Sequence, residues 1–102
     1  MANIDRGIID YRREERQLTK VFKALSDGTR QEILRLLEGQ QRTVGEIVER
    51  IQISQPGVSK HLRVLRDAGL VVARVDAQRR VYGVQPEPLG EIDAWLAPYR
   101  RM

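Results

Sequence analysis

Side chains that make specific hydrogen bonds are concentrated in one segment, which begins near Ser54 and ends at about Ala68. On a helix that turns by about 100° per residue, Val58, Leu62 and Leu65 share one apolar side. The leading end carries Ser54 and Gln55, and the opposite side carries mostly short polar or basic residues, namely Pro56, Ser59, Lys60, Arg63 and Asp67. A helix that enters the major groove of DNA needs small residues near its N-terminus and groups that reach base edges. The segment is therefore predicted to be a DNA-reading helix.

A second group of basic residues follows in a predicted β-hairpin. Two β-rich stretches, 70–75 and 80–84, flank a polar turn, and Arg79 and Arg80 stand at its tip. Residues 54–84 contain six basic and two acidic residues, so this third of the chain carries an excess equal to the whole net charge of +4. Such a local excess favours phosphate contacts. Double-stranded DNA is therefore the expected partner.

The composition excludes several kinds of chemistry. The chain has no cysteine and one histidine, His61. Disulfides, thiol switches and cysteine-based zinc sites are excluded, and a histidine-based metal site has too few ligands. No constellation of carboxylate, serine or lysine side chains argues for catalysis, so neither an enzyme nor a cofactor is expected. His61 lies at the edge of the apolar side of its helix, where both packing and direct DNA contact fit the pattern.

Apolar spacing and capping residues predict the helices that position these groups. Asp27 is placed to cap a second helix, and Thr43 with Glu46 forms the capping box of a short third helix. The first helix carries apolar residues at helical spacing, namely Leu18, Val21, Phe22 and Leu25. A last helix after the hairpin does the same with Ile92, Trp95, Leu96 and Tyr99.

The resulting order is helix, helix, short helix, tight turn, longer helix, hairpin, helix. A short helix, a tight turn and a second helix form a helix-turn-helix, and a hairpin directly after it makes a winged helix. We expect a mainly α fold with a small β-hairpin: a winged helix-turn-helix of about five helices and a two-stranded wing. Residues 1–14 are expected to be an N-terminal arm or a helix start, and residues 15–102 one domain.

The chain is not expected to enter a membrane. No apolar stretch approaches the roughly 18 residues that span a bilayer. The N-terminal segment contains acids and lacks the long apolar core of a signal peptide. A cytoplasmic location is therefore expected.

Three segments resemble the ArsR/SmtB-type transcriptional regulators of bacteria. FKALSDGTRQEIL at 22–34 is similar to their opening, and ISQPGVSKHLRVLRDAGLV at 53–71 is similar to their recognition helix and its exit. RRVY at 79–82 resembles their wing, which adds Tyr82 to the predicted DNA contacts. The resemblance covers roughly residues 17–97 in the same order.

The resemblance implies a homodimeric repressor that binds an inverted-repeat operator. First and last helices pair across the two-fold axis in such proteins. The implied interface residues here are Leu18, Val21, Phe22, Ile92, Trp95, Leu96 and Tyr99.

The chain departs from the resemblance where many such regulators sense metals. Residues 43–48 lack a thiol, and the last helix keeps Glu91 and Asp93 but has no histidine. The chain therefore resembles the branch without a metal or thiol switch. A protein antagonist and a small-molecule effector both stay open as the signal. The wing turn has Ala77 and Gln78 where a glycine is common, which leaves its geometry open.

Two other functions fit a winged helix. One is a protein-interaction module, which would carry an apolar or acidic outer face in place of Ser59, Lys60 and Arg63. The other is a non-specific DNA-binding protein, which would carry a stronger charge. Arg63 and Arg66 can also be read as a solvated helix surface, and Arg79 with Arg80 as a hairpin tip without a ligand.

Overall fold

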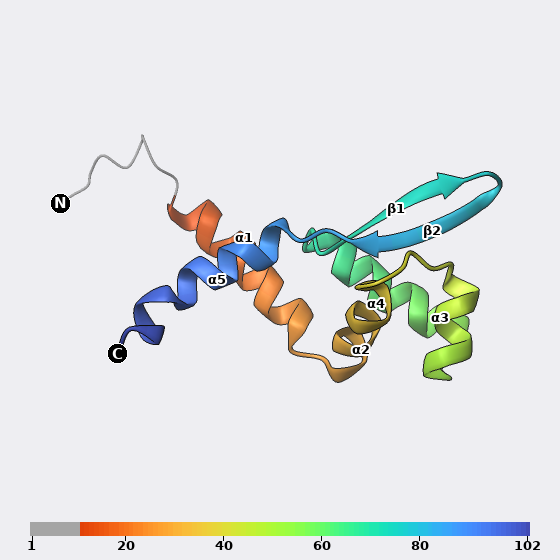
Figure 1. Ribbon diagram of the computed structural model, residues 1–102, viewed down its shortest axis with the longest axis horizontal. Coiled ribbons are helices and arrows are strands. Elements are labelled where there is room, and N and C mark those ends of the chain that lie inside the picture. The colour runs from red at the N-terminus through yellow and green to blue at the C-terminus, as the bar shows by residue number, and fades with distance from the viewer. Residues whose placement is uncertain (1–10) are drawn as a thin grey trace.

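The computed structural model describes residues 11–102, with side chains from Arg16 onward. This part contains five helices and one hairpin (Figure 1). The elements are α1 (Tyr11–Leu25), α2 (Gly28–Leu37), α3 (Val44–Ile51), α4 (Gln55–Asp67), β1 (Val71–Asp76), β2 (Arg79–Val84) and α5 (Glu87–Arg100). The predicted winged helix-turn-helix is confirmed. Helix α1 begins at Tyr11, within the segment 1–14 that is expected to be an arm or a helix start, and residues 1–10 lie outside the described part.

Side-chain caps set the starts of α2 and α3. The Asp27 carboxylate accepts hydrogen bonds from the backbone N–H groups of Thr29 and Arg30, at 2.8 and 3.1 Å. In the capping box of α3, the Thr43 N–H donates to Glu46 Oε1 at 2.8 Å and the Glu46 N–H donates to Thr43 Oγ1 at 3.2 Å. These bonds satisfy N–H groups that have no partner within the helix. Both predicted caps are confirmed.

A sharp turn separates α3 from α4. Gln52 has φ 65°, in the left-handed region, and its N–H donates to the carbonyl oxygen of Val48 at 2.9 Å. This conformation ends α3 and leaves only Ile53 and Ser54 before α4 begins at Gln55. The brevity of the turn makes the two helices one helix-turn-helix unit.

Gly69 connects α4 to the hairpin. It has φ +78°, a conformation that costs glycine little. The N–H of Gly69 donates to the Arg66 carbonyl and the N–H of Leu70 donates to the Leu65 carbonyl, both at 2.9 Å. This pair of bonds is a Schellman motif. It ends α4 and sends the chain directly into β1.

The strands β1 and β2 form an antiparallel wing. The register runs from Val71 opposite Val84 to Asp76 opposite Arg79, which leaves a two-residue turn at 77–78. Ala77 adopts φ 60° in that turn. Such a positive φ at the first turn position favours glycine, so the wing closes with an unfavourable residue.

The hydrophobic core lies among the helices α1–α4 and is closed on one side by the base of the wing. Its buried members come from every element except α5: Val21, Ala24, Ile33, Leu37, Ile47, Val58, Leu62, Leu65, Ala68, Leu70, Val71 and Tyr82. The apolar side of α4 faces this core, so its opposite side faces solvent.

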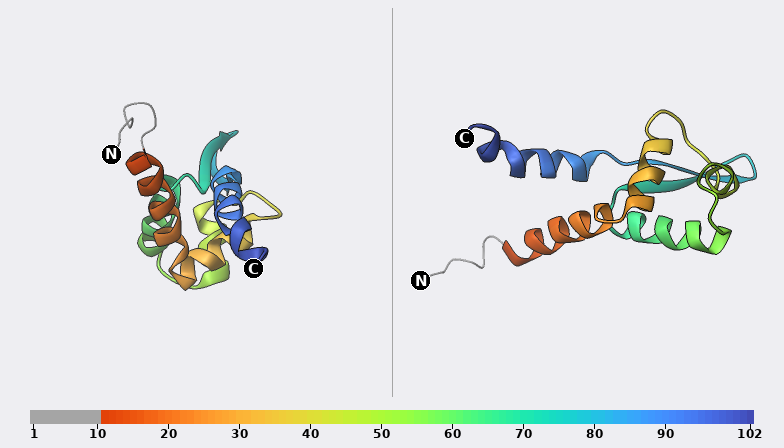
Figure 2. Two further views of the ribbon diagram at one scale, coloured as in Figure 1. Left: turned by 90° about the vertical axis from the view of Figure 1, so that its left-hand side faces the viewer. Right: turned by 90° about the horizontal axis from the view of Figure 1, so that it is seen from below.

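The helices α1 and α5 extend together from the rest of the molecule, with α5 alongside α1 (Figures 1 and 2). Pro88 in the first turn of α5 is buried, whereas most of the helix is exposed. Two helices therefore project from the core and expose apolar side chains.

Candidate nucleic-acid interface

The first turn of α4 is compact and capped. The Ser54 hydroxyl accepts a hydrogen bond from the Gly57 N–H at 3.1 Å. A Cβ atom on Gly57 would lie 3.2 Å from that hydroxyl oxygen, so a larger residue would press on the cap. Pro56 stands in the first turn, where its lack of an N–H group costs no helical bond. The predicted start of the helix at Ser54 is confirmed.

One side of α4 is polar and exposed, as the sequence predicts. We call this side the reading face; its residues are Ser54, Gln55, Pro56, Ser59, Lys60 and Arg63, and all six are exposed. On the opposite side, the exposed fractions of Val58, Leu62 and Leu65 do not exceed 1 %. The helix is therefore held by one side and presents hydrogen-bonding groups on the other.

His61 points to the α2 side of α4 and is half-buried. Its Nδ1 lies 3.3 Å from Nη1 of Arg30. The same guanidinium donates from Nε to the Ala24 carbonyl at 2.7 Å and from Nη2 to the Lys23 carbonyl at 3.1 Å. This contact supports the packing interpretation of His61, and direct DNA contact by His61 stays a prediction. The contact between Arg30 and His61 has no local sequence signal, because the two residues are 31 positions apart.

The wing presents two arginines. Arg79 and Arg80 are exposed, and Arg79 Nη2 lies 3.7 Å from the Asp76 carboxylate across the turn. The Arg80 guanidinium lies 5.8 Å from the centroid of the Tyr82 ring, a cation–π arrangement. Tyr82 itself is only 8 % exposed and belongs to the core. This burial argues against the direct DNA contact predicted for Tyr82, because its ring packs inward below Arg80.

Arg42 anchors the wing, which the sequence did not predict. Its backbone N–H and carbonyl pair with those of Tyr82, at 3.0 and 2.8 Å. Its side-chain Nε donates to the Leu36 carbonyl at 3.0 Å. Arg42 therefore ties β2 to the loop that follows α2. The pairing joins residues 40 positions apart and leaves no periodic pattern in the sequence.

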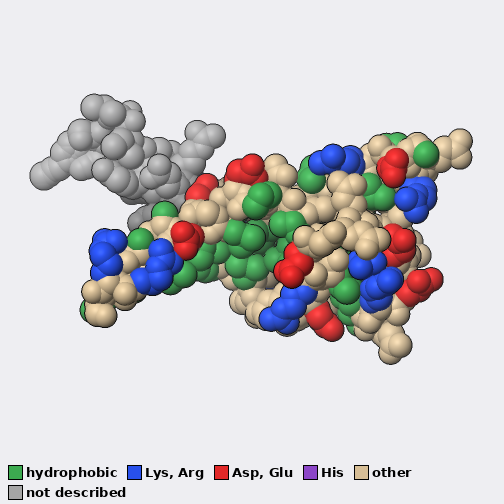
Figure 3. All heavy atoms as spheres, viewed as in Figure 1, with side chains coloured by type: hydrophobic (Ala, Val, Ile, Leu, Met, Phe, Trp, Pro, Cys, Tyr) green, Lys and Arg blue, Asp and Glu red, His purple; other side chains and the backbone are tan. Residues whose placement is uncertain are grey.

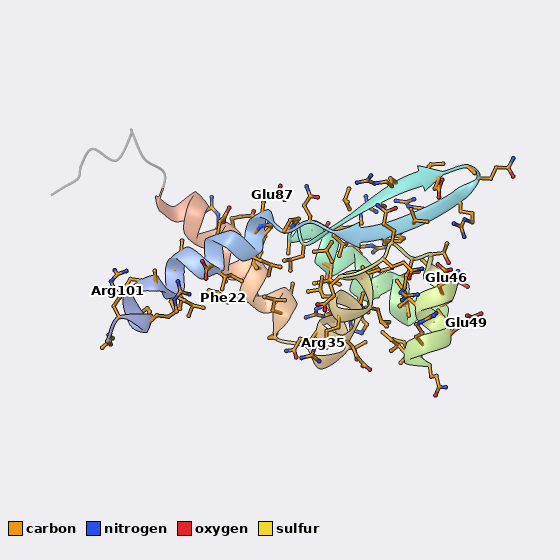
Figure 4. The ribbon with its side chains drawn as sticks, in the orientation of Figure 1. Phe22, Arg35, Glu46, Glu49, Glu87 and Arg101 are labelled. Carbon is orange, nitrogen blue, oxygen red and sulfur yellow. The ribbon has the colours of Figure 1, made fainter. Side chains whose placement is uncertain are left out.

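Apolar side chains on α1 and α5 remain exposed to solvent. We call this the apolar face; it consists of Phe22, Leu89, Trp95, Leu96 and Tyr99, whose exposed fractions lie between 37 and 57 %. The rings of Phe22 and Trp95 meet edge to face at 5.4 Å, and those of Trp95 and Tyr99 lie 5.3 Å apart. Figure 3 shows hydrophobic side chains gathered over α1 and α5, and Figure 4 places Phe22 where the two helices cross.

Not every predicted interface residue belongs to this face. Leu18 and Ile92 are half-buried at its edge. Val21 is 0 % exposed and packs within the core of its own subunit. The interface role predicted for Val21 is therefore corrected, because the side chain has no surface to offer a partner.

Two capping carboxylates have lowered pKa values. The pKa of Asp27 falls below its ordinary value mainly because the Arg30 backbone N–H donates to the carboxylate. The pKa of Glu46 falls mainly because the Thr43 backbone N–H donates to it. Both side chains serve the helix starts. They belong to the scaffold of the helix-turn-helix and leave its reading face neutral or basic.

Two kinds of feature are absent from the described residues. No group of three or more histidine, aspartate or glutamate side chains in that part of the chain could hold a metal ion. None of its helices is long and apolar enough to cross a membrane.

Several known proteins are similar to this chain in sequence and in fold. Residues 27–72 match the model of the bacterial regulatory protein, arsR family. The transcriptional repressor SdpR of Bacillus subtilis is 37 % identical over 79 residues, which are 78 % of this chain and 88 % of SdpR. An ArsR-like transcriptional regulator from Rhodococcus sp. RHA1 superposes with a TM-score of 0.79 at 29 % identity, covering 83 % of this chain and 78 % of its own.

A third neighbour is the homodimeric winged helix-turn-helix DNA-binding domain of Mb0332 from Mycobacterium bovis. It superposes with a TM-score of 0.74 at 29 % identity and covers 99 % of this chain and 91 % of its own. The relatives are transcriptional regulators, a class without enzymatic activity. With a polar reading face on a capped helix, a basic wing and these relatives, the chain belongs to the ArsR family of DNA-binding transcriptional regulators.

Proposed function

We propose that this protein is a repressor that binds an inverted-repeat operator as a homodimer. The observation that carries the proposal is the reading face, which lies directly opposite the buried side of α4. A protein-interaction module would expose apolar groups there. The exposed groups are instead an amide, a hydroxyl and two cations on Gln55, Ser59, Lys60 and Arg63, and these suit base edges and phosphates.

Each part of the interface receives a distinct role in this proposal. Gln55 and Ser59 read bases, and Lys60 and Arg63 contact bases or phosphates at the groove edge. Arg79 and Arg80 on the wing contact phosphate or the minor groove. Tyr82 holds Arg80 in place through the cation–π contact.

The apolar face supports the homodimer. It exposes three aromatic rings, and a surface of this kind on a small domain is typical of an interface. The DNA-binding domain of Mb0332, which is homodimeric, has the same fold. Pairing of the α1 and α5 helices of two subunits would cover the face and point both copies of α4 toward one side of a DNA duplex.

The proposal includes no metal or thiol switch. The chain has no cysteine, and residues 43–48 and α5 lack the ligands that the resemblance would require. The protein would act in the cytoplasm on bacterial DNA. Release from DNA would then depend on a different signal.

Footprinting on the region upstream of its own gene would locate the operator. Fluorescence anisotropy with that fragment should give a dissociation constant of about 10 nM at physiological salt, about a thousandfold tighter than scrambled DNA. Equal affinity for both fragments would contradict the repressor proposal and favour a non-specific DNA-binding protein. No binding to either fragment would favour a protein-interaction module.

Zinc provides a separate control for the absence of a metal switch. Stoichiometric zinc should leave the affinity for the operator unchanged. A clear zinc-dependent loss of binding would show that carboxylates of the dimer form a site.

A further inference from the structure

A cavity opens on the side of α1 that faces α4. Its volume is about 430 Å³, within the range of about 300–1,000 Å³ that small-molecule sites occupy. The lining comes from α1, α2 and α4 and consists of Lys20, Lys23, Ala24, Arg30, Val64, Asp67 and Ala68. No part of the reading face or of the apolar face lines it.

The lining combines positive charge with a small apolar floor. Lys20, Lys23 and Arg30 bring three cations, and Asp67 brings the only carboxylate. Small side chains of α1 and α4 form the apolar part of the wall, namely Ala24, Val64 and Ala68. Charge-assisted hydrogen bonds to a carboxylate or phosphate are the strongest that such a lining offers. A ligand with an anionic group and a compact apolar body matches it best.

The cavity and the proposed dimer interface lie on different sides of α1. Lys20 and Phe22 are two positions apart, which separates their side chains by about 200° around a helix. Phe22 contacts Trp95 of α5, whereas Lys20 lines the cavity with residues of α4. A dimer formed through the apolar face would therefore leave the cavity open to solvent.

The cavity wall is tied to the recognition helix. Val64, Asp67 and Ala68 belong to α4 and its C-terminal cap, so this wall is a flank of the recognition helix, next to the side that carries the reading face. Arg30 is fixed by the carbonyls of Lys23 and Ala24 and reaches His61 on α4. An anion bound here would lie against the recognition helix itself.

We propose that this cavity binds a small organic anion, a carboxylate or phosphate with a compact apolar body, and that the bound anion weakens DNA binding. The second half of this proposal rests on the proposed function. Added negative charge beside α4 repels DNA phosphates, and a single charge at about 10 Å in water changes affinity about twofold. Several phosphates flank the groove, so the loss of DNA affinity should exceed the loss caused by repulsion between the anion and a single phosphate.

Benzoate is a suitable probe because it combines a carboxylate with an apolar ring. The binding test is a ¹H–¹⁵N NMR titration of the full chain without DNA, following the amides of Ala24, Val64 and Ala68. Benzoate should shift these amides saturably. Benzamide, which has the same shape without the charge, and inorganic phosphate, which has charge without an apolar body, should bind at least about tenfold more weakly.

Two charge-matched double variants locate the site. K20Q/K23Q removes two lining cations and should weaken benzoate binding about tenfold or more. R50Q/R101Q removes two exposed cations on α3 and at the end of α5 and should leave benzoate binding unchanged (Arg101 is labelled in Figure 4). Equal benzoate binding by K20Q/K23Q and wild type, or equal binding of benzamide and benzoate, would overturn the anion site. Equal binding of phosphate would overturn the apolar part of the ligand class.

The regulatory half is tested by operator binding at constant ionic strength. Saturating benzoate should weaken operator affinity of the wild type at least about twofold and leave that of K20Q/K23Q unchanged. Benzoate that binds the cavity without changing DNA affinity would overturn regulation only. If the protein binds no specific DNA, the proposed function fails, while the benzoate titration still decides the site. If K20Q/K23Q alone reduces the salt slope of DNA binding relative to R50Q/R101Q, the lysines contact DNA phosphate directly, and the proposed regulation by repulsion between the bound anion and DNA is overturned.

Discussion

The guanidinium of Arg30 in α2 joins His61 in α4, with Nη1 of the arginine 3.3 Å from Nδ1 of the histidine. Two more of its nitrogens donate to carbonyl oxygens at the end of α1. One side chain therefore bridges three helices at the point where the recognition helix meets the scaffold.

Replacement of Arg30 should destabilise the fold. Arg30→Ala removes charge-assisted hydrogen bonds at a side chain that is 15 % exposed, so we expect a loss of about 2–3 kcal/mol in the free energy of unfolding. Urea denaturation would measure it. Arg35→Ala changes an exposed arginine of the same helix and should cost less than about 0.5 kcal/mol. Equal effects would contradict the bridging role of Arg30.

The capping carboxylates predict a loss of stability in acid. Because the folded-state pKa values of Asp27 and Glu46 are lowered, their contributions are fully present above the ordinary values of 3.8 and 4.5 and are lost as the pH falls through the lower, folded values. Asp27→Asn keeps an amide oxygen that can cap α2 but removes the titration. Urea unfolding at several pH values should therefore show a shallower decline for this variant. A decline as steep as in wild type would assign the acid sensitivity elsewhere.

A glycine at position 77 in the wing turn should increase the stability of the fold. Ala77 holds φ 60°, which costs a residue with a Cβ atom, so Ala77→Gly should stabilise the fold by about 1 kcal/mol. The matched control is Gln78→Gly in the same turn, where φ is not positive and glycine should give no gain. Thermal unfolding of the three proteins would compare them, and an equal response of both variants would contradict the conformational argument.

Reading face and wing should respond differently to DNA sequence. Gln55→Ala should reduce discrimination at one or two base pairs by about 1–3 kcal/mol. Arg79→Ala should weaken binding to operator and random DNA alike and reduce the salt slope by about 1. Anisotropy titrations over a series of salt concentrations and operator variants would separate the two. An unchanged specificity profile in Gln55→Ala would refute its role in base reading.

The apolar face should hold the dimer together. Trp95 is 47 % exposed and contacts both Phe22 and Tyr99, so Trp95→Ala should weaken dimerisation by about 2 kcal/mol or more. Sedimentation equilibrium would give the dimer constant. Val75, an exposed apolar residue on the wing, provides the control, since Val75→Ala should leave the constant unchanged. A monomeric wild-type protein would reject the interface.

The parts of the fold that the sequence predicted are those that depend on interactions between residues close together in the chain. The caps at Asp27, Thr43 and Ser54 accept hydrogen bonds from N–H groups within three residues. The starts of these helices can therefore be predicted from short stretches of sequence. The glycine exit at Gly69 is equally local. The order of elements and the division of α4 into a packed and a polar side therefore followed from the sequence alone.

Long-range packing decided the rest. Val21 and Phe22 belong to one apolar stripe, and only the positions of α4 and α5 place the first in the core and the second on the surface. Tyr82 is buried in the core where β2 pairs with Arg42, a residue 40 positions away. The recognition helix that begins after Ser54 was predictable from its own residues. The cationic cavity beside it exists only because tertiary packing brings α1 and α2 against that helix.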